Sequence, residues 1–141
     1  MRHFKLLFIL SCLSTSSYGI GTVNLAVAQN NIASTICKSG WTKTVRPSVS
    51  YTNKIKKQQL QEIKVSWLNA YLYELDHLVP LEVGGAPKDL ANLRIQLWDG
   101  PAGARVKDVL ETRVKRLVCK GTITLEQGQS CFLNGWQTCK Y

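Results

Sequence analysis

Apolar residues recur at helical spacing in two long segments of the chain. From Ala102 to Val118 they fall mostly three or four residues apart, at Val106, Val109, Leu110, Val114, Leu117 and Val118. From Asn53 to about Asn69, after a candidate N-cap at Thr52, a weaker pattern of the same kind includes Ile55, Leu60, Ile63 and Trp67. Thr124 and Gln127 have the spacing of a capping box. The pattern therefore predicts two long helices and a short final one.

Two shorter segments between the long helices have the pattern of β-strands. Residues 71–80 alternate, with Glu74 and Asp76 on one parity and His77 on the other, and residues 92–98 form a second candidate strand beyond Gly84-Gly85. Residues 37–47 read as an extended arm with at most one short strand, and residues 29–34 as a flexible terminus. The order arm, helix, strand, loop, strand, helix, short helix predicts one α+β domain.

The first 28 residues have the layout of an export leader. A positive start, Met1–Lys5, precedes an apolar run at residues 6–13, and Ala26-Val27-Ala28 is a small-x-small cleavage site. The run is shorter than the roughly 20 residues that span a bilayer, so we expect no stable membrane insertion. We expect a leader over 1–28 and a periplasmic or secreted domain over 29–141. Lipidation at Cys12, in a loose lipobox, is the alternative.

The cysteines support export. Four remain beyond the leader, and an even number in a small exported domain indicates two disulfides. Three pairings are open, of which we favour Cys37–Cys119 with Cys131–Cys139. A structural zinc site is the alternative, although the sequence contains no Cys-x-x-Cys pair.

The charge favours a polyanionic partner. The chain has 18 Lys+Arg and 9 Asp+Glu, or +9; without Arg2 and Lys5 the balance is 16 minus 9, or +7. The residues that we expect to face phosphate are Arg94, Arg105, Lys107 and Arg113. Each of them, like the lysines of the helix after Thr52, can instead belong to a solvated helix or strand surface.

Asp76 and His77 are polar residues in an otherwise apolar strand, and Asn92 follows fifteen residues after His77. Phosphodiester hydrolysis needs an activated water and relief of negative charge, which a divalent cation supplies. Oxygen ligands from Asp76 and Asn92 suit Mg²⁺ or Mn²⁺. His77 is the one histidine beyond the leader and can act as a base near neutral pH. Adjacent strand residues point to opposite faces, so Asp76 and His77 share a site only at a strand end or bulge.

These motifs resemble a known family. The run from Glu74 to Gly85 (ELDHLVPLEVGG), followed by Ala91-Asn92-Leu93, resembles the core of HNH (His-Me finger) endonucleases. More narrowly, the chain is similar to small exported bacterial proteins with this signature. In those proteins a Cys-x-x-Gly-Trp-Thr-x-x-x-Arg-Pro segment precedes the core, matched by residues 37–47, and an Ala-Arg-Val-Lys-Asp-x-x-Glu helix follows, matched by residues 104–111.

The resemblance implies a ββα-metal core and a role for each matched residue. His77 would be the general base, Asp76 would bind the metal, and Asn92 would orient the base or complete the metal site. The family's second histidine, on the helix, is absent here. Asp108 either replaces that ligand or serves only as a capping or ion-pairing residue.

We therefore expect a monomeric, secreted endonuclease that cuts DNA, and RNA as a further candidate substrate, with little sequence preference. Two other classes stay open. One is a catalytically degenerate HNH-fold module that binds nucleic acid without cutting it. The other is a small secreted interaction protein in which Asp76 and His77 are structural.

Overall fold

The computed structural model describes residues 20–133 and 135–141. The helices and strands are α1 (Trp41–Val45), α2 (Val49–Glu62), β1 (Tyr73–His77), β2 (Leu93–Leu97), α3 (Ala104–Cys119) and α4 (Leu125–Leu133). Short 3-10 helices lie between them: η1 (Gln29–Ser34), η2 (Trp67–Leu72), η3 (Leu81–Val83), η4 (Leu90–Asn92) and η5 (Trp136–Thr138).

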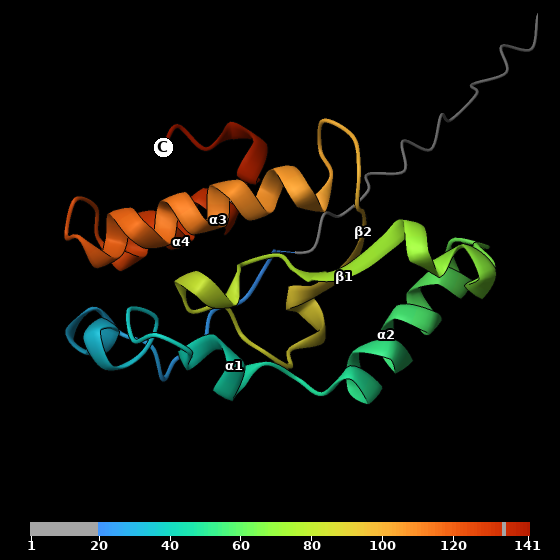
Figure 1. The fold of residues 1–141 in the computed structure, drawn as a ribbon, viewed down its shortest axis with the longest axis horizontal. Coiled ribbons are helices and arrows are strands. Elements are labelled where there is room, and N and C mark those ends of the chain that lie inside the picture. Colours follow the sequence, from blue (N-terminus) through green and yellow to red (C-terminus); the bar gives the residue numbers. More distant parts are fainter. Residues whose placement is uncertain (1–19, 134) are drawn as a thin grey trace, which may run out of the picture.

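A two-stranded antiparallel sheet lies at the centre of the fold (Figure 1). Its register pairs Tyr73 with Leu97 at one end and His77 with Leu93 at the other. Helices α3 and α4 lie side by side above this hairpin in the view of Figure 1, and α1 and α2 lie below it. The α+β class predicted from the sequence is confirmed.

The predicted helices exist, with shifted bounds: α2 ends at Glu62 rather than near Asn69, so Ile63 and Trp67 lie outside it. Helix α3 buries Val114 and Val118 completely, as the spacing predicts, whereas Val106 and Val109 of the same pattern are exposed. Helix α4 follows the expected capping box, because the Gln127 amide donates to Thr124 Oγ1 (3.1 Å) and the Thr124 amide donates to Gln127 Oε1 (2.8 Å). Helix α2 begins four residues earlier than expected: Ser48, not Thr52, is the N-cap and accepts the Tyr51 amide.

The N-terminal part contains more helix than the sequence indicates. The expected extended arm contains the short helix α1, and the expected flexible residues 29–34 form η1. Gln29 Oε1 accepts the Leu125 backbone amide at 2.6 Å, which ties η1 to the start of α4. Both expectations were wrong because long-range contacts to α4 and to the core decide the local conformation here.

The core lies between α3, α4, η3 and the N-terminal segment. Its buried members are Val27, Ile36, Val79, Val83, Val114, Val118, Ile123, Leu125, Cys131 and Phe132. Both predicted disulfides are confirmed: Cys37–Cys119 has a Cα–Cα distance of 5.5 Å and Cys131–Cys139 one of 5.0 Å. Two disulfides in so small a domain are typical of oxidising compartments outside the cytosol.

The predicted leader is only partly within the described residues. Residues 1–19, including Cys12, lie outside them, and residues 20–28 include Val27, which is 7% exposed in the core. The end of the leader at Ala28 stays a prediction. Within 20–133 and 135–141, no helix has both the length and the apolar character needed to cross a membrane.

Candidate active site

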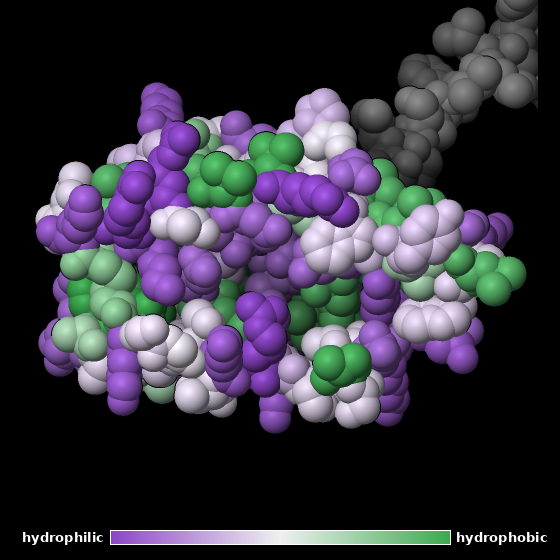
Figure 2. All heavy atoms as spheres, viewed as in Figure 1, coloured by the Kyte–Doolittle hydropathy of each residue, from purple (hydrophilic) through white to green (hydrophobic). Residues whose placement is uncertain are grey.

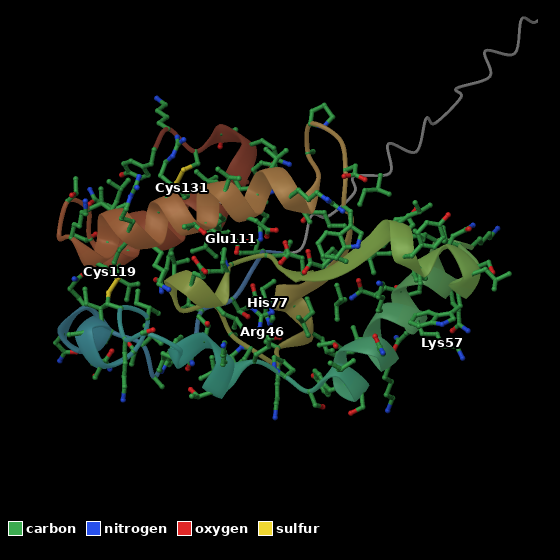
Figure 3. The ribbon with its side chains drawn as sticks, viewed as in Figure 1. Arg46, Lys57, His77, Glu111, Cys119 and Cys131 are labelled. Atoms are coloured by element: carbon green, nitrogen blue, oxygen red, sulfur yellow. A yellow bond between two sulfur atoms is a disulfide. The ribbon has the colours of Figure 1, made fainter. Side chains whose placement is uncertain are left out.

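A polar cavity of about 150 Å³ lies where the end of β1 meets the first half of α3. Its lining residues are Arg46, Glu74, Asp76, His77, Pro80, Leu81, Glu82, Asp108, Glu111 and Thr112. Figure 3 shows Arg46, His77 and Glu111 near one another from different elements. Figure 2 shows hydrophilic residues across the middle of the same face. Asp76 and His77 reach one cavity because His77 is the last residue of β1, which meets the strand-end condition stated above.

His77 is buried, with 6% of its surface exposed, and has a defined ring orientation. Its Nε2 lies 3.0 Å from the Pro87 carbonyl oxygen. A carbonyl can only accept, so Nε2 carries the proton and the basic lone pair of the neutral ring is on Nδ1. Burial lowers the pKa of His77, although the Pro87 carbonyl and Asp76 oppose this shift. The ring is therefore a neutral base near pH 7.

Lys107 lies behind the residues that line the cavity and contacts Asp76, His77 and Glu111. Its ammonium donates to Asp76 Oδ2 (2.7 Å), to the His77 carbonyl (2.8 Å) and to Glu111 Oε1 (2.5 Å), and its side chain is 1% exposed. Burial alone would lower its pKa, but Asp76 and Glu111 outweigh burial and raise it, so the ammonium stays charged. Asp76 Oδ1 also accepts the His77 amide at 2.7 Å. Lys107 thus holds the Asp76 carboxylate and the His77 carbonyl group in place.

The cavity contains more carboxylates than its cations neutralise. Burial raises the pKa of Glu74 to about 7, with repulsion from Asp76 and Asp108 adding to it. Burial also raises the pKa of Glu111 to about 7 against the opposing charge of Lys107. The pKa of Asp108 is raised by burial and by Asp76. Among the described residues, Glu74 Oε2 and Glu82 Oε2 are buried oxygens without a hydrogen-bond donor. The site is thus an electrostatic environment that favours a cation.

Asn92 is fully buried and does not line this cavity. Its Oδ1 accepts the amides of Val79 (2.8 Å) and Thr22 (3.2 Å), and its Nδ2 donates to the carbonyls of Val79 (3.0 Å) and Ala86 (2.9 Å). Both lone pairs of Oδ1 are therefore used, which leaves no ligand oxygen for a metal. Of the two roles that the resemblance implies, the geometry favours orientation: Asn92 holds the loop that carries Pro87, the acceptor for His77.

The glycine pair closes this loop. A Cβ on Gly85 would lie 1.8 Å from the Val79 carbonyl oxygen, so no larger residue fits without moving the backbone. Gly84 has φ of +81°, a conformation that glycine adopts without strain. Gly84-Gly85 therefore lets the chain return close to β1 and place Pro87 against His77.

The four basic residues predicted to face phosphate lie in different surroundings. Arg94, Arg105 and Arg113 are exposed, and Arg105 pairs with Asp99 at 3.2 Å. Lys107 is the exception: it lies inside the protein on three oxygens and cannot reach a polyanion. Arg46, on the segment between α1 and α2, is exposed and lines the cavity instead.

Of the predicted metal ligands, Asp76 and Asp108 share the cavity and Asn92 does not. Within the described part of the chain, no three His, Cys, Asp or Glu side chains are grouped closely enough to hold an ion between them. Mg²⁺ commonly needs only one or two carboxylates, its other ligands being water and substrate phosphate. The donor chemistry of Asp76 and Asp108 therefore fits a hard divalent cation.

The site residues predicted from the sequence did not include Arg46, Glu74, Glu82 or Glu111, although all four line the cavity. Two of them had a usable signal. Glu74 has the strand parity of Asp76, and Glu111 lies four residues from Lys107 and three from Asp108 on one helix face. Comparison of the chain with protein-family models, with curated proteins and with solved structures gave no match.

Proposed function

We propose that this protein is an exported, metal-dependent endonuclease that hydrolyses phosphodiester bonds in DNA, with RNA as a second substrate to test. The observation that carries the proposal is the His77 ring, whose Nε2–H is bound to the Pro87 carbonyl beside a carboxylate-lined cavity. The order β1, β2, α3 and the resemblance to HNH endonucleases support it. Two disulfides support export.

His77 is the general base in this proposal. Its Nδ1 takes a proton from the attacking water, and the resulting imidazolium is stabilised by the Pro87 carbonyl and by the Asp76 carboxylate. Lys107 keeps the Asp76 carboxylate and the His77 backbone in place during this transfer. Because the base is neutral above its lowered pKa, activity should persist at mildly acidic pH.

Asp76 and Asp108 would hold the divalent cation. Each Asp76 oxygen accepts one hydrogen bond and keeps a lone pair. A Mg²⁺ or Mn²⁺ ion bound there supplies charge relief on the phosphoryl oxygens and on the leaving oxygen. Arg46 at the cavity and the exposed Arg94, Arg105 and Arg113 would contact phosphates without reading sequence, so binding should weaken as salt rises.

A plasmid-nicking assay tests the proposal. The oxidised protein is incubated with supercoiled DNA and Mg²⁺, Mn²⁺ or EDTA. We expect metal-dependent nicking that falls about 100-fold or more in His77→Ala, the usual loss for a missing general base. Lys57→Ala, which changes an exposed residue of α2 outside the cavity, is the control for folding and charge. A folded wild type that cuts neither DNA nor RNA would contradict the proposal.

A second candidate is a nucleic-acid-binding module without turnover. It is favoured by the 6% exposure of His77 and by the lack of a three-donor metal group within the described residues. It predicts salt-sensitive DNA binding that His77→Ala leaves unchanged, with no cleavage at any metal concentration. The same samples distinguish the two candidates in a binding assay run beside the nicking assay.

A further inference from the structure

The segment from Gly21 to Val27 pairs with the loop that supports the candidate site. The Ala86 amide donates to the Thr22 carbonyl at 2.9 Å, and the Asn24 amide donates to the Gly84 carbonyl at 2.8 Å. These bonds flank an antiparallel bridge between Val23 and Gly85. The segment therefore provides hydrogen-bond partners for the Gly84 carbonyl and the Ala86 amide, in the loop that contains Gly84-Gly85 and is called the glycine loop below.

Side chains attach the same segment more firmly. The Thr22 amide donates to Asn92 Oδ1 at 3.2 Å, and Thr22 Oγ1 donates to Asp89 Oδ2 at 2.8 Å. Val27 is 7% exposed in the core, and a Cβ on Gly84 would lie 2.8 Å from Val27 Cγ1. A Cβ on Gly21 would lie 2.9 Å from Val79 and 3.1 Å from Asn92 Oδ1. Residues 21–27 thus pack as an integral part of the domain.

Proteolytic removal of these residues would damage the fold next to the site. A cut after Ala28 would leave the Gly84 carbonyl and the Ala86 amide without partners and would take one donor from Asn92. It would also expose the part of the core that Val27 covers. A processing step that yields a stable protein must therefore cut upstream of Gly21.

We propose that the leader is removed by hydrolysis of the Gly19–Ile20 peptide bond, so that the mature protein begins at Ile20. Water adds hydroxide to the Gly19 carbonyl carbon and a proton to the Ile20 nitrogen. Ser17-Tyr18-Gly19 has the small-x-small pattern that a leader peptidase recognises. The pattern lies six residues beyond the apolar run 6–13, whereas Ala28 lies fifteen beyond it. Ile20 is 75% exposed, so the new N-terminal residue lies at the surface.

The mass of the protein exported from the full precursor tests this inference, independently of any nuclease activity. We expect a chain that begins at Ile20. A chain that begins at Gln29, or a lipid-modified Cys12, would overturn it. In matched variants, Gly19→Leu should accumulate precursor while Ala28→Leu is processed like the wild type; the reverse result would equally overturn it.

A folding measurement tests the packing argument separately. Oxidised chains that begin at Ile20 and at Gln29 are compared by thermal unfolding. We expect the shorter chain to melt about 10 °C lower, because it loses Val27 and the hydrogen bonds to the loop. Equal melting temperatures would show that residues 20–28 do not belong to the folded unit and would remove the basis of the proposal.

Discussion

The first half of α3 buries charge, whereas the second half buries aliphatic side chains. Glu111, whose side chain is 13% exposed, lines the cavity, and Lys107, whose side chain is 1% exposed, lies behind the lining against Asp76 and Glu111. Val114 and Val118 are fully buried in the core. Burial of valine stabilises the fold directly. Burial of an ion pair roughly balances desolvation against attraction and stabilises little, although losing one partner is costly.

The second half of α3 therefore stabilises the fold, and the first half positions residues of the candidate site. The second half, with Cys119 in a disulfide to Cys37, fixes α3 against the core. The first half can then hold Lys107 against the end of β1, where its ammonium orders Asp76 and the His77 carbonyl. Substitutions in either half of α3, or at Glu74 on β1, should separate these two contributions.

The largest effect should come from the disulfide of the second half. Cys37–Cys119 joins residues 82 apart, so Cys37→Ala/Cys119→Ala should lower the free energy of unfolding by about 4.5 kcal/mol in the chain-entropy model. Cys131–Cys139 joins residues 8 apart, and its double alanine variant should lose about 2.5 kcal/mol. Urea denaturation measures both losses. Equal losses would show that loop length does not govern the contribution of these disulfides.

Removing the cation of the first half should have the next largest effect. Lys107→Met leaves Asp76 and Glu111 without their shared ammonium and should lower the free energy of unfolding by about 3 kcal/mol. Lys57→Met changes an exposed lysine of α2 far from the site (Figure 3) and should alter it by less than about 0.5 kcal/mol. Adding Glu111→Gln to Lys107→Met should restore part of the loss. A Lys107→Met protein as stable as the wild type would contradict this account of the ion pairs.

The sequence predicted the second half of α3 better than the first. The spacing of Val114 and Val118 identifies a buried helix face, and the cysteine count limits the disulfides to three pairings. Lys107 has a local partner four residues on, but its burial depends on Asp76, which is 31 residues away on β1. Spacing along the chain carries no information on such a contact, so the sequence alone predicts a surface position for Lys107.

The same limit explains Asn92 and the N-terminal segment. The motif identifies Asn92 as important, but only its contacts with Val79, Ala86 and Thr22 show that its amide holds a loop. Residues 21–27 look like the end of a leader because small and apolar residues suit both a cleavage site and a packed edge. They pair with the glycine loop about 60 residues further along the chain, and the local sequence pattern does not predict such a pairing.

The smallest predicted effect concerns Glu74, which faces the first half of α3 from β1. Because burial raises its pKa to about 7 from the usual 4.5, the folded state binds the Glu74 proton more tightly than the unfolded state. Ionising Glu74 therefore costs stability as pH rises from about 4.5 to 7. In EDTA, Glu74→Gln should match the wild type near pH 4 and exceed it by about 1 kcal/mol at pH 8, a value discounted for solvent screening.

The lowered pKa of His77 acts in the opposite direction, since stability is lost as pH falls below about 6.5. It is common to both proteins in the Glu74 experiment and cancels in their difference. Glu62→Gln, at the exposed end of α2, is the matched control for removing one carboxylate. Urea denaturation at a series of pH values gives the difference curve. A Glu74→Gln advantage that is flat with pH would show that Glu74 is ionised at pH 5 and that the cavity holds less uncompensated charge than its geometry indicates.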